Sequence, residues 1–168
     1  MVPEPASQLL NVGRIPFNDK MNDMKIHRVD HIGIIVQDLA AVKAFFLDLG
    51  LELLGEMQLE SELADSVTGL ENVRSLIAML AIPGGGTNIE LSQFYHPKDE
   101  NGVQHLPSNA LGIRHIAFAV EDIDAIVARL REKTFEPFSE VQNYEGIYKL
   151  CYIHGPEGII IELAERLT

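Results

Sequence analysis

Two stretches of the chain share one order of apolar and polar positions, and that order predicts the main elements. Residues 31–46, HIGIIVQDLAAVKAFF, begin as an apolar, β-rich run and continue with apolar residues at helical spacing. Residues 115–130, HIAFAVEDIDAIVARL, repeat this order without a gap, so that His31 falls on His115. The repetition predicts two diverged copies of a strand followed by a helix.

Each predicted helix has its own start signal. Asp38 and Asp122 occupy equivalent places and are suited to accept the unpaired amides of a first helical turn, while Gly50 is placed to end the first helix. The apolar faces consist of Leu39, Val42, Phe46 and Leu49 in the first copy and of Ile123, Ile126, Val127 and Leu130 in the second.

Further strands follow each helix. Residues 51–59 favour a strand, and residues 75–82 form a hairpin with residues 88–94 around Pro-Gly-Gly-Gly. The glycines lack the Lys-Ser/Thr and the following helix of a phosphate-binding loop. In the second copy, residues 148–154 form the equivalent hairpin with residues 159–165. Each copy is therefore a βαβββ module, and the fold class is α+β.

The module boundaries follow from composition. We expect an N-terminal extension at residues 1–25, a first module at 26–95, a polar linker rich in Pro and Gly at 96–110, and a second module at 111–168. The acidic stretch from Ser61 to Val73 is either a lid over a cavity or a solvated surface helix.

Strand alternation places four ionisable residues on one side of the modules. Successive side chains of a strand point to opposite faces, so the bulky apolar residues share the face beneath the helices. The other face combines small residues with His31, Glu90, His115 and Glu162. Small residues beside ionisable groups are typical of a ligand cavity rather than of a packed core.

Two imidazoles and two carboxylates are a suitable ligand set for one divalent ion, such as Ni, Zn, Co, Mn or Fe. The alternative is that each His is an ordinary partly buried residue and each Glu faces solvent. The recurrence of both residue types at equivalent positions favours the metal site. Arg114, next to His115, points to the opposite face and is assigned a structural or interface role.

Charge and composition exclude several classes of function. The formal net charge of -12 argues against nucleic-acid binding. Neither a membrane span nor a signal peptide is expected, and the single Cys151 in an apolar run fits a buried, reduced thiol. We therefore expect a cytoplasmic protein with a small-molecule ligand and neither a nucleic-acid nor a membrane partner.

The motifs VDHIGIIVQDL, NIELSQF, IRHIAFAVEDI and GPEGIIIELAE resemble those of the vicinal oxygen chelate superfamily, which is the glyoxalase, bleomycin-resistance and dioxygenase family. The resemblance covers residues 26–167. It implies paired βαβββ modules that curl into an open barrel around a metal, commonly completed in a homodimer.

The order His31, Glu90, His115, Glu162 is similar to the ligand pattern of bacterial glyoxalase I and methylmalonyl-CoA epimerase. That similarity implies proton abstraction next to a carbonyl through a metal-stabilised enediolate, in a lyase or isomerase reaction. Glu162 would be the general base, and Glu90 a ligand able to act as the opposing acid or base.

Other chemistries of the family remain alternatives. Fosfomycin-resistance transferases have a His where Glu90 stands, and dioxygenases usually need a longer chain, so both are disfavoured. A different class of function is a metal-free binding protein that sequesters a cationic compound, as bleomycin-resistance members of the family do. The negative charge of the chain favours that binder, whereas four ligand-type residues favour the enzyme.

Overall fold

A computed structural model describes residues 25–168, so the predicted extension lies outside the described residues except for Lys25. The elements of the first module are β1 (His31–Ile35), α1 (Leu39–Leu49), β2 (Glu52–Leu59), α2 (Glu62–Thr68), β3 (Arg74–Ala81) and β4 (Asn88–His96). Those of the second are β5 (Ile116–Val120), α3 (Ile123–Glu132), β6 (Gln142–Tyr144), β7 (Tyr148–His154), the short 3-10 helix η2 (Pro156–Gly158) and β8 (Ile160–Arg166).

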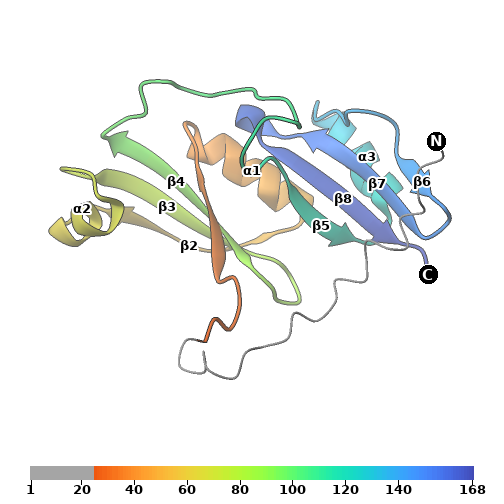
Figure 1. The fold of residues 1–168 in the computed structure, drawn as a ribbon, viewed down its shortest axis with the longest axis horizontal. Helices are drawn as coiled ribbons and strands as arrows, with labels where there is room; N and C mark the ends of the chain where they lie inside the picture. The colour runs from red at the N-terminus through yellow and green to blue at the C-terminus, as the bar shows by residue number, and fades with distance from the viewer. Residues whose placement is uncertain (1–24) are drawn as a thin grey trace.

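The strands form two sheets with the same internal order. That order is β1-β4-β3-β2 in the first sheet and β5-β8-β7-β6 in the second. The first strand of each module lies parallel to its last strand, and the other neighbours are antiparallel. Figure 1 shows one sheet toward each end of the molecule. The matching topology confirms the predicted repeat and the α+β class.

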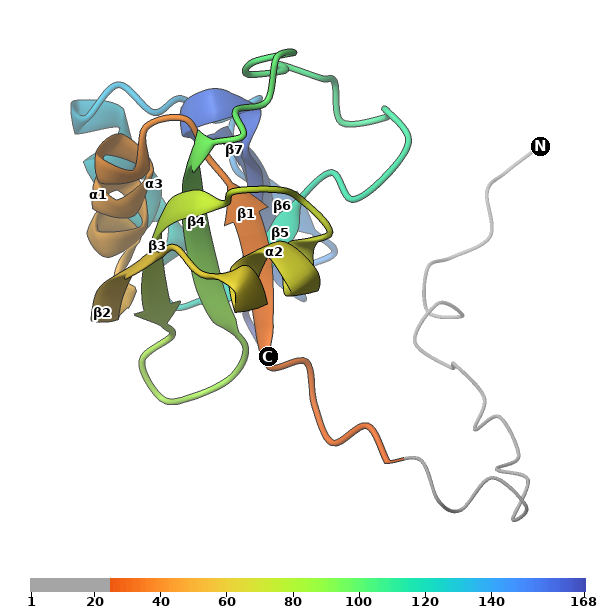
Figure 2. The ribbon, with the colours of Figure 1, turned by 90° about the vertical axis from the view of Figure 1, so that its left-hand side faces the viewer.

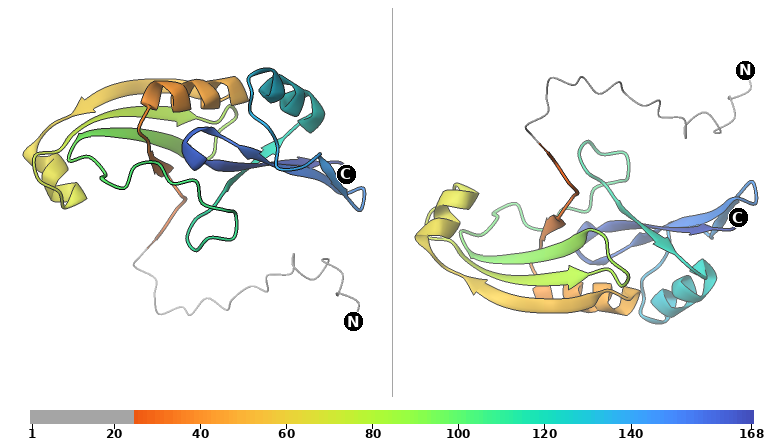
Figure 3. Two further views of the ribbon diagram at one scale, coloured as in Figure 1. Left: turned by 90° about the horizontal axis from the view of Figure 1, so that it is seen from above. Right: turned by 90° about the horizontal axis from the view of Figure 1, so that it is seen from below.

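The helices α1 and α3 cover the same side of the two sheets. Figures 2 and 3 show α1 and α3 together on that side, while the linker between the modules follows the other side. Both helix starts agree with the sequence prediction: the Asp38 carboxylate accepts the Ala41 amide at 3.0 Å, and the Asp122 carboxylate accepts the Ala125 amide at 3.2 Å. The opposite side, which neither α1 nor α3 covers, is the open side of the sheets.

One apolar core joins the modules beneath α1 and α3. The predicted apolar faces of β4 and β8 are buried there, including Leu91 and Leu163. Phe46 of α1 lies 6.4 Å from Phe118 of β5 between ring centroids, and so connects the two modules. Because both modules contribute to this core, their relative positions are fixed by packing as well as by the linker.

The first module departs from the simple βαβββ pattern by one helix. The acidic stretch forms α2, in which the Ser61 hydroxyl accepts the Ala64 amide at 3.1 Å, and Gly69 ends the helix in a left-handed conformation at φ 71°. The Asp65 carboxylate accepts the Val73 amide at 2.7 Å. The stretch from Ser61 to Val73 thus begins with a helix, which lies on the side of the sheet away from α1 (Figure 3).

Two further expectations concern the interior and the membrane. Cys151 is a free thiol with 5 % of its surface exposed, as predicted, and burial raises its pKa to about 11. Within residues 25–168, every helix is too short or too polar to cross a membrane.

Candidate metal centre

The first module brings two of the four predicted residues together. β1 and β4 pair in parallel, with Gly33 beside Glu90, so that His31 and Glu90 share the open face of the sheet. His31 Nε2 lies 3.9 Å from Glu90 Oε2. The Ser92 hydroxyl donates to the other carboxylate oxygen, Oε1, at 3.2 Å. The hydroxyl thereby orients Glu90 with its free oxygen toward His31.

The second module forms the same pair by the same pairing of strands. His115 immediately precedes β5 rather than lying within it, and Ala117 is beside Glu162 of β8. His115 Nε2 lies 3.2 Å from Glu162 Oε2. Ala164 stands where the first module has Ser92, so Glu162 lacks the hydroxyl donor that Glu90 has.

The two His–Glu pairs do not meet within one copy of the chain. In residues 25–168 no three His, Cys, Asp or Glu side chains lie close enough together to hold a metal ion. Each pair faces the open side and is only partly buried: the side chains of His31 and His115 are 42 % and 39 % exposed. Within residues 25–168, one copy therefore presents two separate His–Glu pairs, and the four predicted residues do not converge on one point.

The second ring nitrogen of each histidine has a different neighbour, which the sequence reasoning did not single out. His31 Nδ1 lies 3.3 Å from Asp30 Oδ2, and Arg28 donates to Asp30 Oδ1 at 2.8 Å. The hydrogen bond from Arg28, followed by that from His31, lowers the pKa of the Asp30 carboxyl. His115 Nδ1 instead lies 3.5 Å from the Tyr152 hydroxyl oxygen.

Signals for these neighbours existed in the sequence. Asp30 is adjacent to His31, and the hairpin register places Tyr152 opposite Glu162.

Arg114 has the structural role expected for it, because its guanidinium donates to the carbonyls of Leu106 and Pro107 at 3.0 and 3.2 Å. It thereby attaches the linker to the start of the second module.

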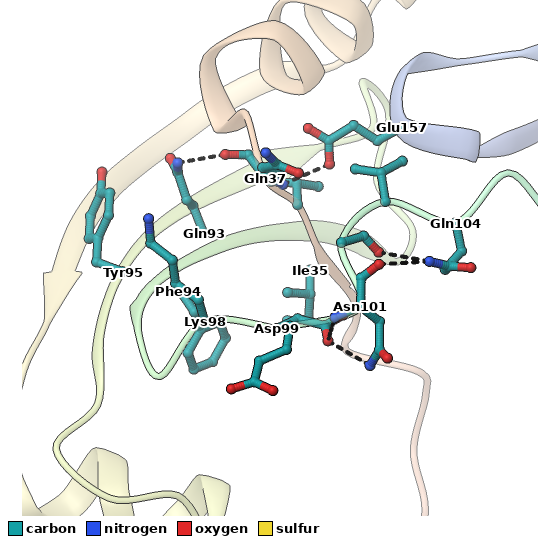
Figure 4. Close-up of a pocket in the computed structure, with 14 residues that line it drawn as sticks. Ile35, Gln37, Gln93, Phe94, Tyr95, Lys98, Asp99, Asn101, Gln104 and Glu157 are labelled. Atoms are coloured by element: carbon teal, nitrogen blue, oxygen red, sulfur yellow. Dashed lines mark hydrogen bonds between the residues drawn. The ribbon is translucent and has the colours of Figure 1, made fainter.

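A cavity of about 580 Å³ lies at the far end of β1 from His31. Figure 4 shows it between the ends of β1 and β4 and the beginning of the linker, with Glu157 of η2 at one edge. Ile35 and Phe94 line it together with the polar side chains of Lys98, Asn101 and Gln104. Neither His–Glu pair lines this cavity, although Ile35 and His31 lie on the same face of β1.

Hydrogen bonds already engage two of the cavity's carboxylates. Asp99 accepts the backbone amide of Asn101 at 3.0 Å and its side-chain amide at 2.9 Å. Glu157 accepts the backbone amides of Gln37 and Asp38 at 2.7 and 2.6 Å. These bonds shape the wall of the cavity and connect the second module to the start of α1.

Comparison with known proteins matches the chain to one family. Residues 30–152 match the model of the glyoxalase/bleomycin resistance protein/dioxygenase superfamily. The chain is 33 % identical to the protein YaeR of Escherichia coli K12 over 144 residues, which are 84 % of this chain and 98 % of YaeR.

Two solved structures extend the comparison. A glyoxalase family protein from Bacillus cereus superposes with a TM-score of 0.84 at 43 % identity, over 88 % of this chain and 99 % of that one. The fosfomycin resistance protein FosX of Listeria monocytogenes, complexed with Mn(II) and 1S,2S-dihydroxypropylphosphonic acid, superposes with a TM-score of 0.57 at 20 % identity, over 83 % and 90 % of the two chains.

Proposed function

The chain belongs to the glyoxalase/bleomycin resistance protein/dioxygenase superfamily, and on that basis we propose that it is a divalent-metal-dependent lyase or isomerase. Its reaction moves a proton from a carbon next to a carbonyl group of a small substrate. The observation that carries the proposal is the pair of repeat-related His–Glu contacts, His31 with Glu90 and His115 with Glu162, on the open faces of the sheets.

The spacing within each pair fits a shared metal ion. Donor atoms that are each about 2.1 Å from one ion lie about 3.0 to 3.4 Å apart in octahedral or tetrahedral arrangements. The Nε2-to-oxygen distances of 3.2 Å in the second pair and 3.9 Å in the first are compatible with this after small side-chain rotations. Imidazole and carboxylate together suit Ni, Zn, Co, Mn or Fe. The Mn(II) complex of FosX supports the view that this fold accommodates such an ion.

The complete site requires a second copy of the chain in this proposal. The first pair of one copy faces the second pair of the other, which gives a homodimer with two equivalent sites. Large apolar side chains exposed near the first sheet support such a partner, since 56 % of Met57 in β2 and 71 % of Leu63 and 77 % of Val67 in α2 are exposed. Met57 lies opposite Ile77, which lies opposite Ser92, so Met57 is on the face of Glu90.

Different neighbours suit the two carboxylates to different roles. A hydrogen bond from Ser92 holds the Glu90 carboxylate in one orientation, as a permanent ligand requires. Glu162 has Ala164 in the corresponding place and is the better candidate to accept and return the substrate proton. A bound divalent ion would supply positive charge to stabilise the charge that develops on the substrate carbonyl oxygen.

The cavity at the end of β1 suits the part of the substrate that does not react. Along β1, Ile35 lies four residues from His31, which is about 13 Å in an extended strand. Gly33 lies between them, and a Cβ built there would be 3.9 Å from Glu90 Oε1, so the absence of a side chain leaves this strip open. A substrate that spans the strip carries its carbonyl group near His31 and a polar end near Lys98 and Asn101.

Metal content is the direct test. Protein purified without a metal-binding tag is compared by elemental analysis with the His31→Ala/His115→Ala double variant. Near-stoichiometric metal that is lost in the variant supports the proposal, and isomerisation of hemithioacetals and epimerisation of thioesters are then assayed on the loaded protein. Wild-type protein that takes up no metal after reconstitution would contradict it and favour the metal-free binder of cationic compounds.

A further inference from the structure

The two histidines of the candidate site differ in the group that faces their second ring nitrogen. Asp30 Oδ2 is 3.3 Å from His31 Nδ1, whereas the Tyr152 hydroxyl oxygen is 3.5 Å from His115 Nδ1. One partner is a carboxylate and the other a phenol. The pairs that look equivalent in the repeat are therefore chemically unequal.

The sequence of each module accounts for this difference. In the alignment that places His31 on His115, Asp30 falls on Arg114, whose guanidinium donates to linker carbonyls instead. Tyr152 lies opposite Glu162 in the β7–β8 hairpin, and the residue opposite Glu90 in the β3–β4 hairpin is Met79, which has no hydroxyl. Each module therefore supplies a partner from a position at which the other module cannot.

The charge of the partner decides how strongly it affects the histidine as a metal ligand. A carboxylate that accepts the Nδ1 proton of an imidazole fixes the tautomer whose Nε2 lone pair is free, and it makes that nitrogen a better electron donor. A neutral hydroxyl gives the same orientation with less effect on basicity. Arg28 holds Asp30 by its Oδ1 at 2.8 Å and leaves Oδ2 for His31.

We propose that Asp30 is a positioning residue that makes His31 the stronger of the two histidine donors to a divalent cation, and that Tyr152 orients His115 more weakly. This inference rests on the proposed function, because it requires the His–Glu pairs to bind metal. It assigns unequal contributions to the two modules: the first holds the ion, and the second completes its coordination.

The test is a Co²⁺ titration of the metal-free full chain, followed by visible absorption. Asp30→Ala is expected to weaken Co²⁺ binding about 10- to 100-fold, the usual cost of losing an outer carboxylate. Asp30→Asn, which keeps an acceptor oxygen without the charge, is expected to lie between Asp30→Ala and wild type. Tyr152→Phe is expected to weaken binding less than Asp30→Ala. Glu132→Gln, which removes a negative charge from the exposed end of α3, is the matched control and should bind as wild type does.

Asp30→Ala removes the carboxylate beside His31 and also releases the Arg28 cation near the site. The Arg28→Gln/Asp30→Ala double variant, which lacks that cation, separates these two causes of weaker Co²⁺ binding. Binding as weak as in Asp30→Ala alone supports the proposal, whereas wild-type affinity in the double variant overturns it. Unchanged affinity in both Asp30 variants also overturns it and leaves the metal site intact as a proposal. A wild-type protein that binds no Co²⁺ would instead contradict the proposed function and this inference with it.

Discussion

The carboxylate of Glu157 accepts the backbone amide of Asp38 at 2.6 Å and thereby joins the second module to the first turn of α1. It also accepts the amide of Gln37 at 2.7 Å. The second module uses an internal residue for the same purpose, because Glu165 of β8 accepts the amides of Asp122 and Ile123 at the start of α3. The two helix starts are thus held by carboxylates, one from across the module boundary.

Glu157→Ala is expected to lower the free energy of unfolding by about 1 to 3 kcal/mol, because two amides at a helix N-terminus lose a charged acceptor. Urea denaturation measures the change. Glu132→Ala at the exposed end of α3 is the control and should change stability by less than about 0.5 kcal/mol. Equal stability of the Glu157 variant and wild type would show that solvent replaces the carboxylate without cost.

Mixing variants tests whether the metal site is shared between two copies. His31→Ala and His115→Ala each damage both sites of their own homodimer. When the two variants are refolded together, half of the dimers are mixed, and each mixed dimer has one intact site, so about a quarter of wild-type metal binding is expected to return. Elemental analysis of the mixture, compared with each variant alone, gives the result. A site built within one copy would gain nothing from mixing.

Glu162→Gln and Glu90→Gln are expected to separate proton transfer from metal binding. Loss of the proposed base should reduce turnover about 10²- to 10⁴-fold at saturating metal, since a positioned general base contributes that range. Loss of the Glu90 carboxylate should instead reduce the affinity for the metal, because Glu90 is the proposed permanent ligand. Turnover and metal content measured on the same samples distinguish the two effects. Full turnover by Glu162→Gln with its metal retained would exclude Glu162 as the base.

A reporter tryptophan tests the assignment of the cavity. The chain contains no Trp, so Phe94→Trp introduces a single tryptophan into the cavity wall. Adding a substrate that the loaded enzyme turns over should shift or quench its emission in a saturable way, because the indole loses water contact. Leu47→Trp, at a half-exposed position of α1, should not respond. Identical behaviour of both variants would place the substrate elsewhere.

The thiol of Cys151 should react slowly with iodoacetamide. Its pKa is raised to about 11 by burial, so at pH 8 only about one molecule in a thousand carries the reactive thiolate. Because the folded state holds this proton more tightly than the unfolded state, the contribution of Cys151 to stability is complete below the unfolded pKa. It is lost as the pH rises from about 8.5 toward 11. Mass spectrometry of native and urea-unfolded protein should show labelling mainly after unfolding.

Much of the fold was accessible from the sequence because its signals are local. Apolar alternation identified the buried faces of β4 and β8, and Asp38 and Asp122 identified both helix starts. The helix α2 was harder to recognise, because its short acidic segment has only Ala64 buried and therefore lacks an apolar face. In the structure, Ser61 caps its start and Gly69 its end.

The candidate site was likewise predicted in part from the sequence and decided in part by the tertiary structure. Repetition within the sequence by itself selected His31, Glu90, His115 and Glu162 and placed each on the face away from the helices, since strand alternation depends only on the order of residues. Only the tertiary structure decided that these residues meet as two separate pairs. Strand pairing within a module brings a His to its Glu, whereas packing of Phe46 on Phe118 beneath the sheets sets how the modules lie relative to each other. The contact of Glu157 with the start of α1 depends on the same packing between modules, which the local order of residues does not encode. The contact of Tyr152 with His115 instead follows from strand pairing within the second module.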